Sequence, residues 1–425
     1  MKRLLVLAYY FPPLGMSGVQ RTLKFVKYLP ENGWQPVVVT PDHRGSYGHD
    51  PALLAEAAPA TIVRTRSLDP LFLSPPRNDP HAVNKHRGSI NLVNFFFVPD
   101  NKIGWVPFAV AAGVRAGRRQ RIDAVYSTAP PYSSHLAALL VATILGKPLV
   151  TDYRDAWSQR NPLNHLPTAL HQRINRALER CVSRHSRLVM AINREIADGL
   201  RAADQPPDKF VVVPHGYDPQ DFAGLPRPDR GQKFTLAYSG TFMGDRNPAV
   251  LAEAVSHLKR NQPQLYADLR VVIAGSHRPQ DPGIVARLGI SDVFDFRSYL
   301  PHQQSLALIT QADALWLVIG AREGPTVSSS KLYEYLGAGR PVIASIPAGC
   351  AAARIIAQTK AGIILDPRDA QGLAAAIAAL YQRRQQGRPL FKPEAAEVSA
   401  YDRRAITQRF ARLLDSITPG TASAN

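Results

Sequence analysis

The sequence predicts a soluble, globular α/β protein with two domains, each built around its own parallel sheet, and three observations lead to this fold class. The chain has 425 residues, which is enough for two hydrophobic cores. Short continuous apolar runs alternate with helical segments, as expected of strands that are buried on both faces. Glycine-containing turns join a strand to a helix near residue 15 and again near residue 240. Each half of the chain therefore predicts a separate set of βαβ units.

The composition narrows the class of protein further. Hydrophobic residues make up 45% of the chain and charged residues 20%, and the longest apolar run, near 136–145, is well short of the ~20 residues of a membrane-spanning helix. Cys181 and Cys350 are the only cysteines, so we expect a reducing cytoplasm and no disulfide framework. The net charge of +18 suits an anionic substrate, an acidic membrane surface or nucleic acid.

The first expected strand is the apolar run Leu4–Ala8. Pro12 and Pro13 follow it without a small-residue cleavage site, so we do not expect a signal peptide. A loop and the first turn of a helix come next, before a strand at 36–40. Such a turn can bind an anion, although it lacks the G-x-G-x-x-G of a dinucleotide site, and a plain strand-to-helix turn is the alternative. Its candidate residues are Gly15, Ser17, Gly18 and Arg21.

Residues 68–107 form a long, proline-rich segment without clear periodicity. Loops of this length in compact domains are usually functional or mobile. The segment contains aromatic residues that we expect to be exposed, namely Phe95, Phe96, Phe97 and Trp105. An acceptor site that touches lipid headgroups and a lid packed on its own domain are equally compatible with this pattern.

Further strands of the first half are expected at 122–127, 148–151 and 187–192. Arg154 and Asp155 follow the second of these strands after two residues, Asp152 and Tyr153. Charged groups at the carboxyl end of a parallel strand face the crevice in which α/β proteins bind ligands. The alternative is an Arg–Asp pair that serves only the structure.

An amphipathic helix with a basic stripe is predicted near residues 168–187. Its arginines recur at spacings of three and four and therefore lie along one side of the helix. A solvated face is the common explanation of such a stripe, and docking on anionic lipid is the other. The arginines are Arg173, Arg176, Arg180, Arg184 and Arg187.

The segment 219–231, rich in proline and aspartate, is a natural domain boundary. The second half starts with a strand at 234–239 that ends in Ser239 and is followed by Gly240 and Arg246. This order of strand, glycine loop and helix repeats the pattern of a phosphate-binding turn. Further strands are expected at 269–275, 293–296, 314–319 and 363–365, with a helix from about 369 and a terminal helix near 402–417.

The most informative stretch is 322–346. A Gly-Pro break leads into a polar loop, a short helix, two glycines and a buried strand. Serines before a helix leave backbone N–H groups for an anion, which the helix dipole also favours. Lys331 adds a cation, and Glu334, one turn further, can accept hydrogen bonds from a pair of sugar hydroxyls. The loop residues are Thr326, Ser328, Ser329, Ser330 and Lys331, and together they fit a diphosphate and a ribose. An ordinary capped helix in solvent is the alternative.

This stretch resembles the donor-binding motif of retaining family-4 glycosyltransferases of the bacterial polysaccharide type, which have the GT-B fold. Glu334 matches the second Glu of their E-x7-E pattern, but Thr326 stands in the place of the first. Arg246 stands where relatives keep a Lys for the donor phosphates, and Thr241 where many keep an Arg. Arg154 and Asp155 lie about where the family has a His-Asp pair. The FPP…G…R loop near residue 15 resembles the family's acceptor-side loop.

The resemblance covers essentially the whole chain and implies two Rossmann-like domains that face a central cleft. Residues 1–222, with a returning helix at 402–418, would bind the acceptor, and residues 223–401 would bind the nucleotide-diphosphate sugar. The donor-binding residues would be Ser239, Gly240, Arg246, Thr326, Ser328, Ser329, Ser330, Lys331 and Glu334.

The implied activity is transfer of a hexose, with retention, to a lipid-linked acceptor or a growing cell-surface glycan. The protein would work in the cytoplasm, with an anionic membrane surface as a further partner. Arg246, Lys331 and the serine amides offer charge for the leaving diphosphate, and no D-x-D pattern is present, so we expect neither a metal nor another cofactor.

Because Thr326 carries no charge, Asp155 and Glu323 are the nearest candidate catalytic carboxylates. A nucleotide-sugar epimerase of the same architecture and a non-catalytic nucleotide-sugar binder remain alternatives. A nucleic-acid partner would explain the net charge but not the order of the motifs, and we do not expect one.

Overall fold

The computed structural model describes residues 1–15, 17–42, 49–69, 95–158, 168–202, 204–226, 233–242 and 244–418. The described residues form two compact units. The first contains the chain up to His215 and again from Arg403, and the second contains Gly216–Asp402. The second unit thus begins at Gly216, earlier than the expected 223. No helix within the described ranges is both long and apolar enough to span a membrane.

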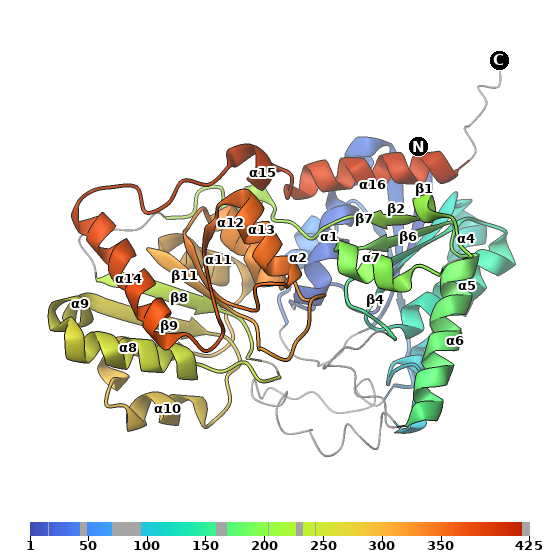
Figure 1. Ribbon diagram of the computed structural model, residues 1–425. Helices are drawn as coiled ribbons and strands as arrows, with labels where there is room; N and C mark the ends of the chain where they lie inside the picture. The colour runs from blue at the N-terminus through green and yellow to red at the C-terminus, as the bar shows by residue number, and fades with distance from the viewer. Residues whose placement is uncertain are drawn as a thin grey trace. The chain divides into compact units, whose positions relative to one another are not determined.

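The first unit is built on a parallel sheet whose described strands follow the order β3-β2-β1-β4-β5-β6-β7 (Figure 1). The order reverses between β1 and β4, and ligands of such sheets bind beyond the carboxyl ends of the strands at this point. The bounds are β1 Lys2–Leu7, β2 Trp34–Pro41, β3 Thr61–Thr65, β4 Ala124–Ala129, β5 Leu149–Tyr153, β6 Leu188–Ala191 and β7 Phe210–Val212.

Helices cover both faces of this sheet (Figure 1), so its central strands are buried on both sides. The described helices are α1 Ser17–Tyr28, α2 Leu53–Glu56, α4 Val106–Gln120, α5 Ser133–Leu145, α6 Ala169–His185, α7 Arg194–Leu200 and α16 Arg403–Ile417, with short 3-10 turns η1 Pro30–Asn32, η3 Ile103–Trp105 and η4 Pro207–Lys209.

The last described helix of the chain, α16, belongs to the core of the first unit. Phe410 packs its ring 4.7 Å from that of Phe25 on α1 and 5.2 Å from that of Tyr126 on β4, measured between centroids. Ile406 and Leu414 are buried in the same cluster. The apolar side of this amphipathic helix is therefore covered by residues near the start of the chain.

The second unit contains a smaller parallel sheet, with described strands in the order β10-β9-β8-β11-β12-β13. It also has a reversal, between β8 and β11. Its strands are β8 Phe234–Ser239, β9 Leu269–Ala274, β10 Phe294–Arg297, β11 Ala314–Val318, β12 Val342–Ser345 and β13 Gly362–Leu365. Its helices are α8 Ala249–Asn261, α9 Pro263–Asp268, α10 Asp281–Arg287, α11 His302–Gln311, α12 Ser330–Ala338, α13 Ala351–Thr359, α14 Ala370–Gln385 and α15 Ala395–Ser399, with turns η5 Pro219–Phe222 and η6 Ser291–Val293.

The predicted fold class is confirmed: both units are α/β with parallel sheets, and most described strands lie within a few residues of the expected runs. Strand β3 was not predicted from the sequence. The prediction that Trp105 is exposed is wrong. Its side chain is fully buried, and its indole Nε1 donates a hydrogen bond to Thr65 Oγ1 over 2.8 Å. Phe95 and Phe96 are exposed as expected, whereas Phe97 is half-buried.

Candidate functional site

The polar residues of the second unit gather where β8 and β11 end. Gly240 directly follows β8, and its backbone has a φ of +137°. A Cβ built there would lie 1.9 Å from Lys331 Cε, so a side chain at position 240 would displace the lysine of α12 from the end of β8. Ser239, Gly240 and Lys331, which are far apart in the sequence, are thus brought together.

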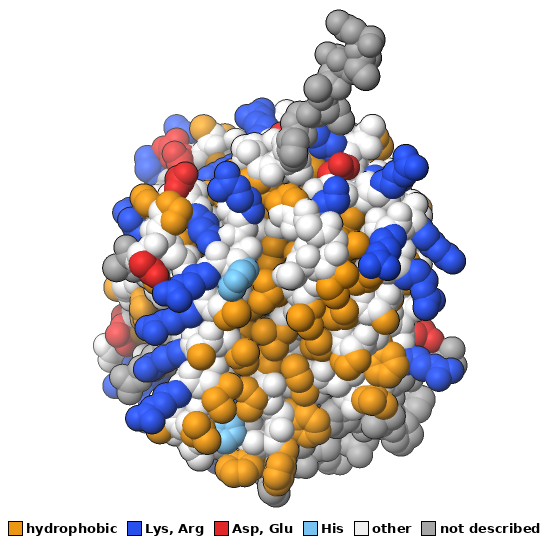
Figure 2. Space-filling view, turned by 90° about the vertical axis from the view of Figure 1, so that its right-hand side faces the viewer, with side chains coloured by type: hydrophobic (Ala, Val, Ile, Leu, Met, Phe, Trp, Pro, Cys, Tyr) orange, Lys and Arg blue, Asp and Glu red, His pale blue; other side chains and the backbone are white. Residues whose placement is uncertain are grey.

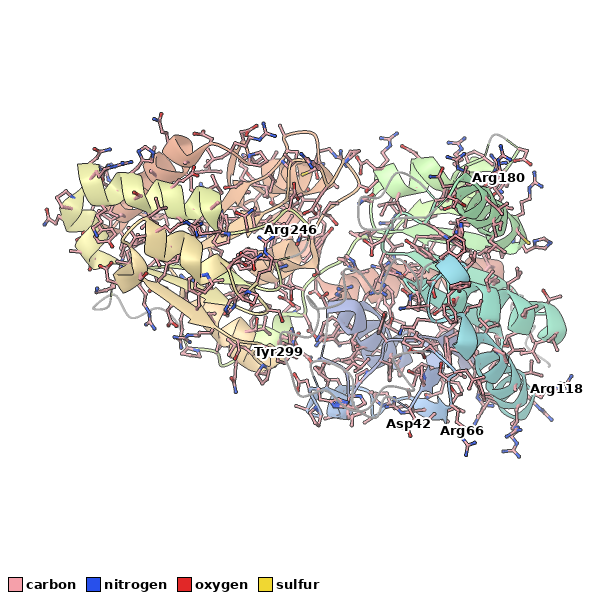
Figure 3. The ribbon with its side chains drawn as sticks, turned by 90° about the horizontal axis from the view of Figure 1, so that it is seen from below. Asp42, Arg66, Arg118, Arg180, Arg246 and Tyr299 are labelled. Carbon is pink, nitrogen blue, oxygen red and sulfur yellow. The ribbon has the colours of Figure 1, made fainter. Side chains whose placement is uncertain are left out.

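Arg246 and Glu323 form a buried ion pair with two hydrogen bonds (Arg246 is labelled in Figure 3). Arg246 Nε donates to Glu323 Oε1 over 2.6 Å, and Nη2 donates to Oε2. The backbone N–H of Gly320 donates to the same carboxylate over 3.2 Å. Burial alone would lower the pKa of Arg246, but the hydrogen bond and charge of Glu323 outweigh it and raise that pKa. Two residues expected to act separately on a ligand are therefore bound to each other.

Lys331, unlike Arg246, has no hydrogen-bonded carboxylate among the described residues to balance its charge. Burial lowers the pKa of its ammonium to about 7, and the positive charge of Arg246 adds to this effect, while Glu334 and Glu323 oppose it. Its Nζ lies 5.4 Å from the ring centroid of Tyr238. A bound anion would restore the usual preference of Lys331 for its charged form.

The loop of Ser328 and Ser329 leaves hydrogen-bond donors at the start of α12 that a ligand could use. Ser329, the N-cap residue, has a φ of 57° and its side chain makes no capping bond. Among the described residues, the buried Oγ of Ser328 has no hydrogen-bond partner. Ser330 begins the helix, and Thr326 lies half-buried earlier in the loop. Backbone N–H groups at such a helix start favour an anion.

Glu334 lies half-buried one turn into α12, and its Oε1 is 3.3 Å from Nε2 of His302, the first residue of α11. On the same helix α11, Ser305 Oγ is 2.6 Å from Ser239 Oγ. Sequence reasoning missed His302 and Ser305. The order of the strands could have indicated these two residues. The helix that links β10 to β11 must pass β8, so its residues can lie close to the end of that strand.

In the first unit, the side chain of Arg21 is fully buried. Its Nε and Nη2 donate to the two carboxylate oxygens of Asp152 over 2.7 and 2.8 Å. The remaining donors reach the backbone carbonyls of Val213 and Pro214. Tyr126 also donates to Asp152, over 2.6 Å. Arg21 therefore links α1, β5 and the chain beyond β7, which is a structural arrangement and not the ligand-facing one expected.

Arg154 and Asp155 differ sharply in their surroundings. Arg154 is buried, with Nη1 donating to the Gly18 carbonyl over 2.8 Å and Nη2 donating to that of Pro130. Asp155 is exposed at the carboxyl end of β5. The loop of Gly15, Ser17 and Gly18 thus lies beside Arg154, and Asp155 offers a solvent-facing carboxylate at the same end of the sheet.

A second pair near this end of the sheet was not predicted. Ser127 Oγ lies 2.7 Å from His135 Nδ1, and both side chains are buried. Burial lowers the pKa of His135 to about 3, so its imidazole is neutral. Within the described part of the chain its Nε2 has no hydrogen-bond partner.

Two family descriptions match consecutive parts of this chain. "Glycosyltransferase Family 4" matches residues 16–221, and "Glycosyl transferases group 1" matches residues 233–383. The chain is also 26% identical over 203 residues to a D-inositol 3-phosphate glycosyltransferase of Stackebrandtia nassauensis. That match covers 43% of this chain and 43% of the relative, so it spans less than half the length of either.

Solved structures with the same fold cover nearly the whole chain. HepE of Anabaena in complex with UDP is 16% identical with a TM-score of 0.65, and the match covers 98% of this chain and 100% of that chain. Sucrose-phosphate synthase of Thermosynechococcus elongatus is 16% identical with a TM-score of 0.67, and the match covers 98% and 99%. At this identity the likeness concerns the fold.

Proposed function

We propose that the chain is a group 1, family-4 type glycosyltransferase that transfers a hexose from a nucleotide-diphosphate sugar, since the two family descriptions match residues 16–221 and 233–383 and the chain has the GT-B fold. The acceptor that we propose is a lipid-linked or growing cell-surface glycan, with retention of configuration at the transferred sugar. The proposed place of action is the cytoplasm, at the inner face of the membrane. Neither matching family is described as an epimerase or a binding protein, so those alternatives are not favoured.

The observation that carries the donor proposal is the meeting of Lys331, the uncapped start of α12 and Glu334 beside the end of β8. Cations and backbone N–H groups fixed before the reaction can stabilise the charge that develops on a leaving diphosphate. Glu334 is one helical turn away, within reach of a ribose on the same ligand. HepE has been crystallised with UDP and with UDP-glucose, which supports a nucleotide-sugar donor.

The hydrogen bonds between Arg246 and Glu323 suggest a separate role for each residue. Glu323 fixes the guanidinium of Arg246 with two hydrogen bonds, so we propose that it positions this cation rather than acting on the sugar itself. Asp155, exposed in the first unit, is then our candidate for orienting or deprotonating an acceptor hydroxyl. Since Arg246 and Lys331 supply positive charge, the proposed transfer needs no metal.

Calorimetry with the full chain and a panel of nucleoside diphosphates and nucleotide sugars tests the donor proposal. Glu334→Ala should weaken binding of the preferred nucleotide by roughly 1.5–3 kcal/mol, because a charge-assisted hydrogen bond to the ligand is lost. Glu397→Ala is the matched control, since Glu397 is an exposed carboxylate on α15 of the same unit. Equal affinities for the wild type and Glu334→Ala would rule out the ribose role.

Donor affinity should also depend on pH through Lys331. With its pKa near 7 in the free protein, the protonated form prevails below about pH 7 and attracts the diphosphate, so affinity should fall as the pH rises through and above 7. A nucleotide sugar is the better ligand here than a nucleoside diphosphate, because its phosphate diesters do not titrate in this range. The same titration with Lys331→Met should be nearly flat. A wild-type affinity that does not change with pH would contradict the prediction.

A further inference from the structure

The first unit exposes one face of a helix layer that is apolar at its centre. Helix α5 lies between α4 and α6 and contacts both of them, and its inner side packs on β4. Its outer side carries Leu140 and Ile144, which are 48% and 51% exposed. We refer to the outer surface of α4, α5 and α6, with Phe95 and Phe96, as the helix-layer face.

The apolar centre continues beyond α5. On α6, Leu170 and Ile174 are exposed, and Phe96 is 73% exposed. Phe95 is held beside α6, because its carbonyl lies 2.9 Å from His171 Nε2 and the two rings are 5.2 Å apart. Figure 2 shows apolar side chains gathered in the middle of this side of the molecule. A group of large exposed apolar residues on one face usually marks an interaction site.

Arginines stand on both sides of the apolar centre (Figures 2 and 3). Helices α4 and α5 contain no Asp or Glu, and the one acidic residue of α6, Glu179, is buried and accepts hydrogen bonds from Ser158. Arg184 is paired with Asp204, and the other arginines of α6 form no ion pair with a described residue. The exposed arginines are Arg115, Arg118 and Arg119 on α4 and Arg173, Arg176, Arg180 and Arg184 on α6.

We propose that the helix-layer face docks on the surface of an anionic phospholipid bilayer. The apolar side chains of α5, α6 and Phe96 would enter the boundary between headgroups and acyl chains, while the flanking arginines bind lipid phosphates. The arginine stripe of α6 is then one edge of the docking surface. The apolar centre adds the side chains that insert below the lipid headgroups.

Charge complementarity favours a bilayer over a second copy of the chain. In a two-fold dimer the same patch meets itself, so the positively charged arginines of one copy would face those of the other without carboxylates between them. A bilayer offers many phosphates and an apolar layer beneath them. The purpose of this docking rests on the proposed function, because a lipid-linked acceptor would be presented at the membrane surface. The vesicle-binding experiment itself needs no nucleotide-sugar donor.

The experiment is co-sedimentation of the full chain with vesicles of phosphatidylcholine alone or mixed in equal parts with phosphatidylglycerol. The wild type should bind the mixed vesicles and lose binding as salt is added. Arg176→Glu with Arg180→Glu should weaken binding by at least about 25-fold, the product of about fivefold for each arginine. Leu140→Ser with Ile144→Ser should weaken it about tenfold or more, because less apolar surface leaves water.

Matched controls lie in the second unit, at exposed positions of the same chemistry. Leu288→Ser is the apolar control, and Arg260→Glu with Arg287→Glu repeats the charge change. Both should bind vesicles as the wild type does, and calorimetry should give all variants the same nucleotide affinity. Docking that survives with nucleotide affinity absent would reject the donor proposal alone.

Two outcomes would overturn the docking proposal. One is equal vesicle binding by the wild type and the helix-layer variants. The other is a wild type that is dimeric by light scattering while Leu140→Ser with Ile144→Ser is monomeric, which would make this face an interface between copies of the chain.

Discussion

Replacing Asp155 with Asn should slow sugar transfer by about 10²–10⁴-fold, the usual contribution of a general base. The carboxylate is exposed at the carboxyl end of β5, whereas the neighbouring Arg154 is turned toward the backbone carbonyls of Gly18 and Pro130. Asn keeps the size of the side chain and removes its ability to take a proton. Single-turnover rates with saturating donor measure the chemical step.

The matched control for this change is Asp198→Asn, which alters an exposed carboxylate on α7 of the same unit. It should leave transfer unchanged, and neither variant should change nucleotide affinity, since both residues belong to the first unit. A full transfer rate in Asp155→Asn would remove this residue from the chemistry. A loss of nucleotide affinity would show instead that the substitution disturbs the fold.

The second large effect is expected at the Arg246–Glu323 pair. Arg246→Met leaves a buried carboxylate without its partner, and the breaking of such a pair typically costs about 3–5 kcal/mol of unfolding free energy. Turnover should also fall by about 10²–10³-fold if Arg246 stabilises the leaving diphosphate. The single variant therefore mixes a stability effect with a catalytic one.

A double variant separates the two effects. Arg246→Met with Glu323→Gln removes both charges but keeps an acceptor for the Gly320 N–H, so urea unfolding should show most of the stability restored while turnover stays low. Lys360→Met, which breaks the exposed pair with Glu394, is the control and should change neither quantity much. Wild-type turnover in the double variant would mean that Arg246 does not serve the diphosphate.

Sequence reasoning succeeded where structure follows from neighbouring residues. Strands such as β1, β2, β9, β11 and β12 contain short apolar runs, and burial on two faces leaves that pattern in the sequence. Ser328, Ser329, Ser330, Lys331 and Glu334 could be grouped because one loop and one helix carry them all. These parts of the candidate site needed no knowledge of tertiary contacts.

The failures are contacts between distant segments. Arg21 was expected to serve an anion-binding turn because it stands in the first turn of a helix, but its guanidinium binds Asp152, far along the chain, inside the core. Trp105 lies in a proline-rich segment and is nevertheless buried against Thr65. The partnership of Glu323 with Arg246 also depends on two separate loops of one sheet. Local sequence patterns carry no information on such partners.

The placement of α16 has a consequence for how the protein folds during its synthesis on the ribosome. Domains usually fold in the order in which the ribosome produces them. Here Phe410 is required beside Phe25 and Tyr126, and every residue of the second unit is synthesised before it. The nascent chain must therefore keep the apolar surface of α1 uncovered while the later-encoded unit is being made. The core of the earlier-encoded unit can therefore be completed only after the later-encoded unit has been synthesised.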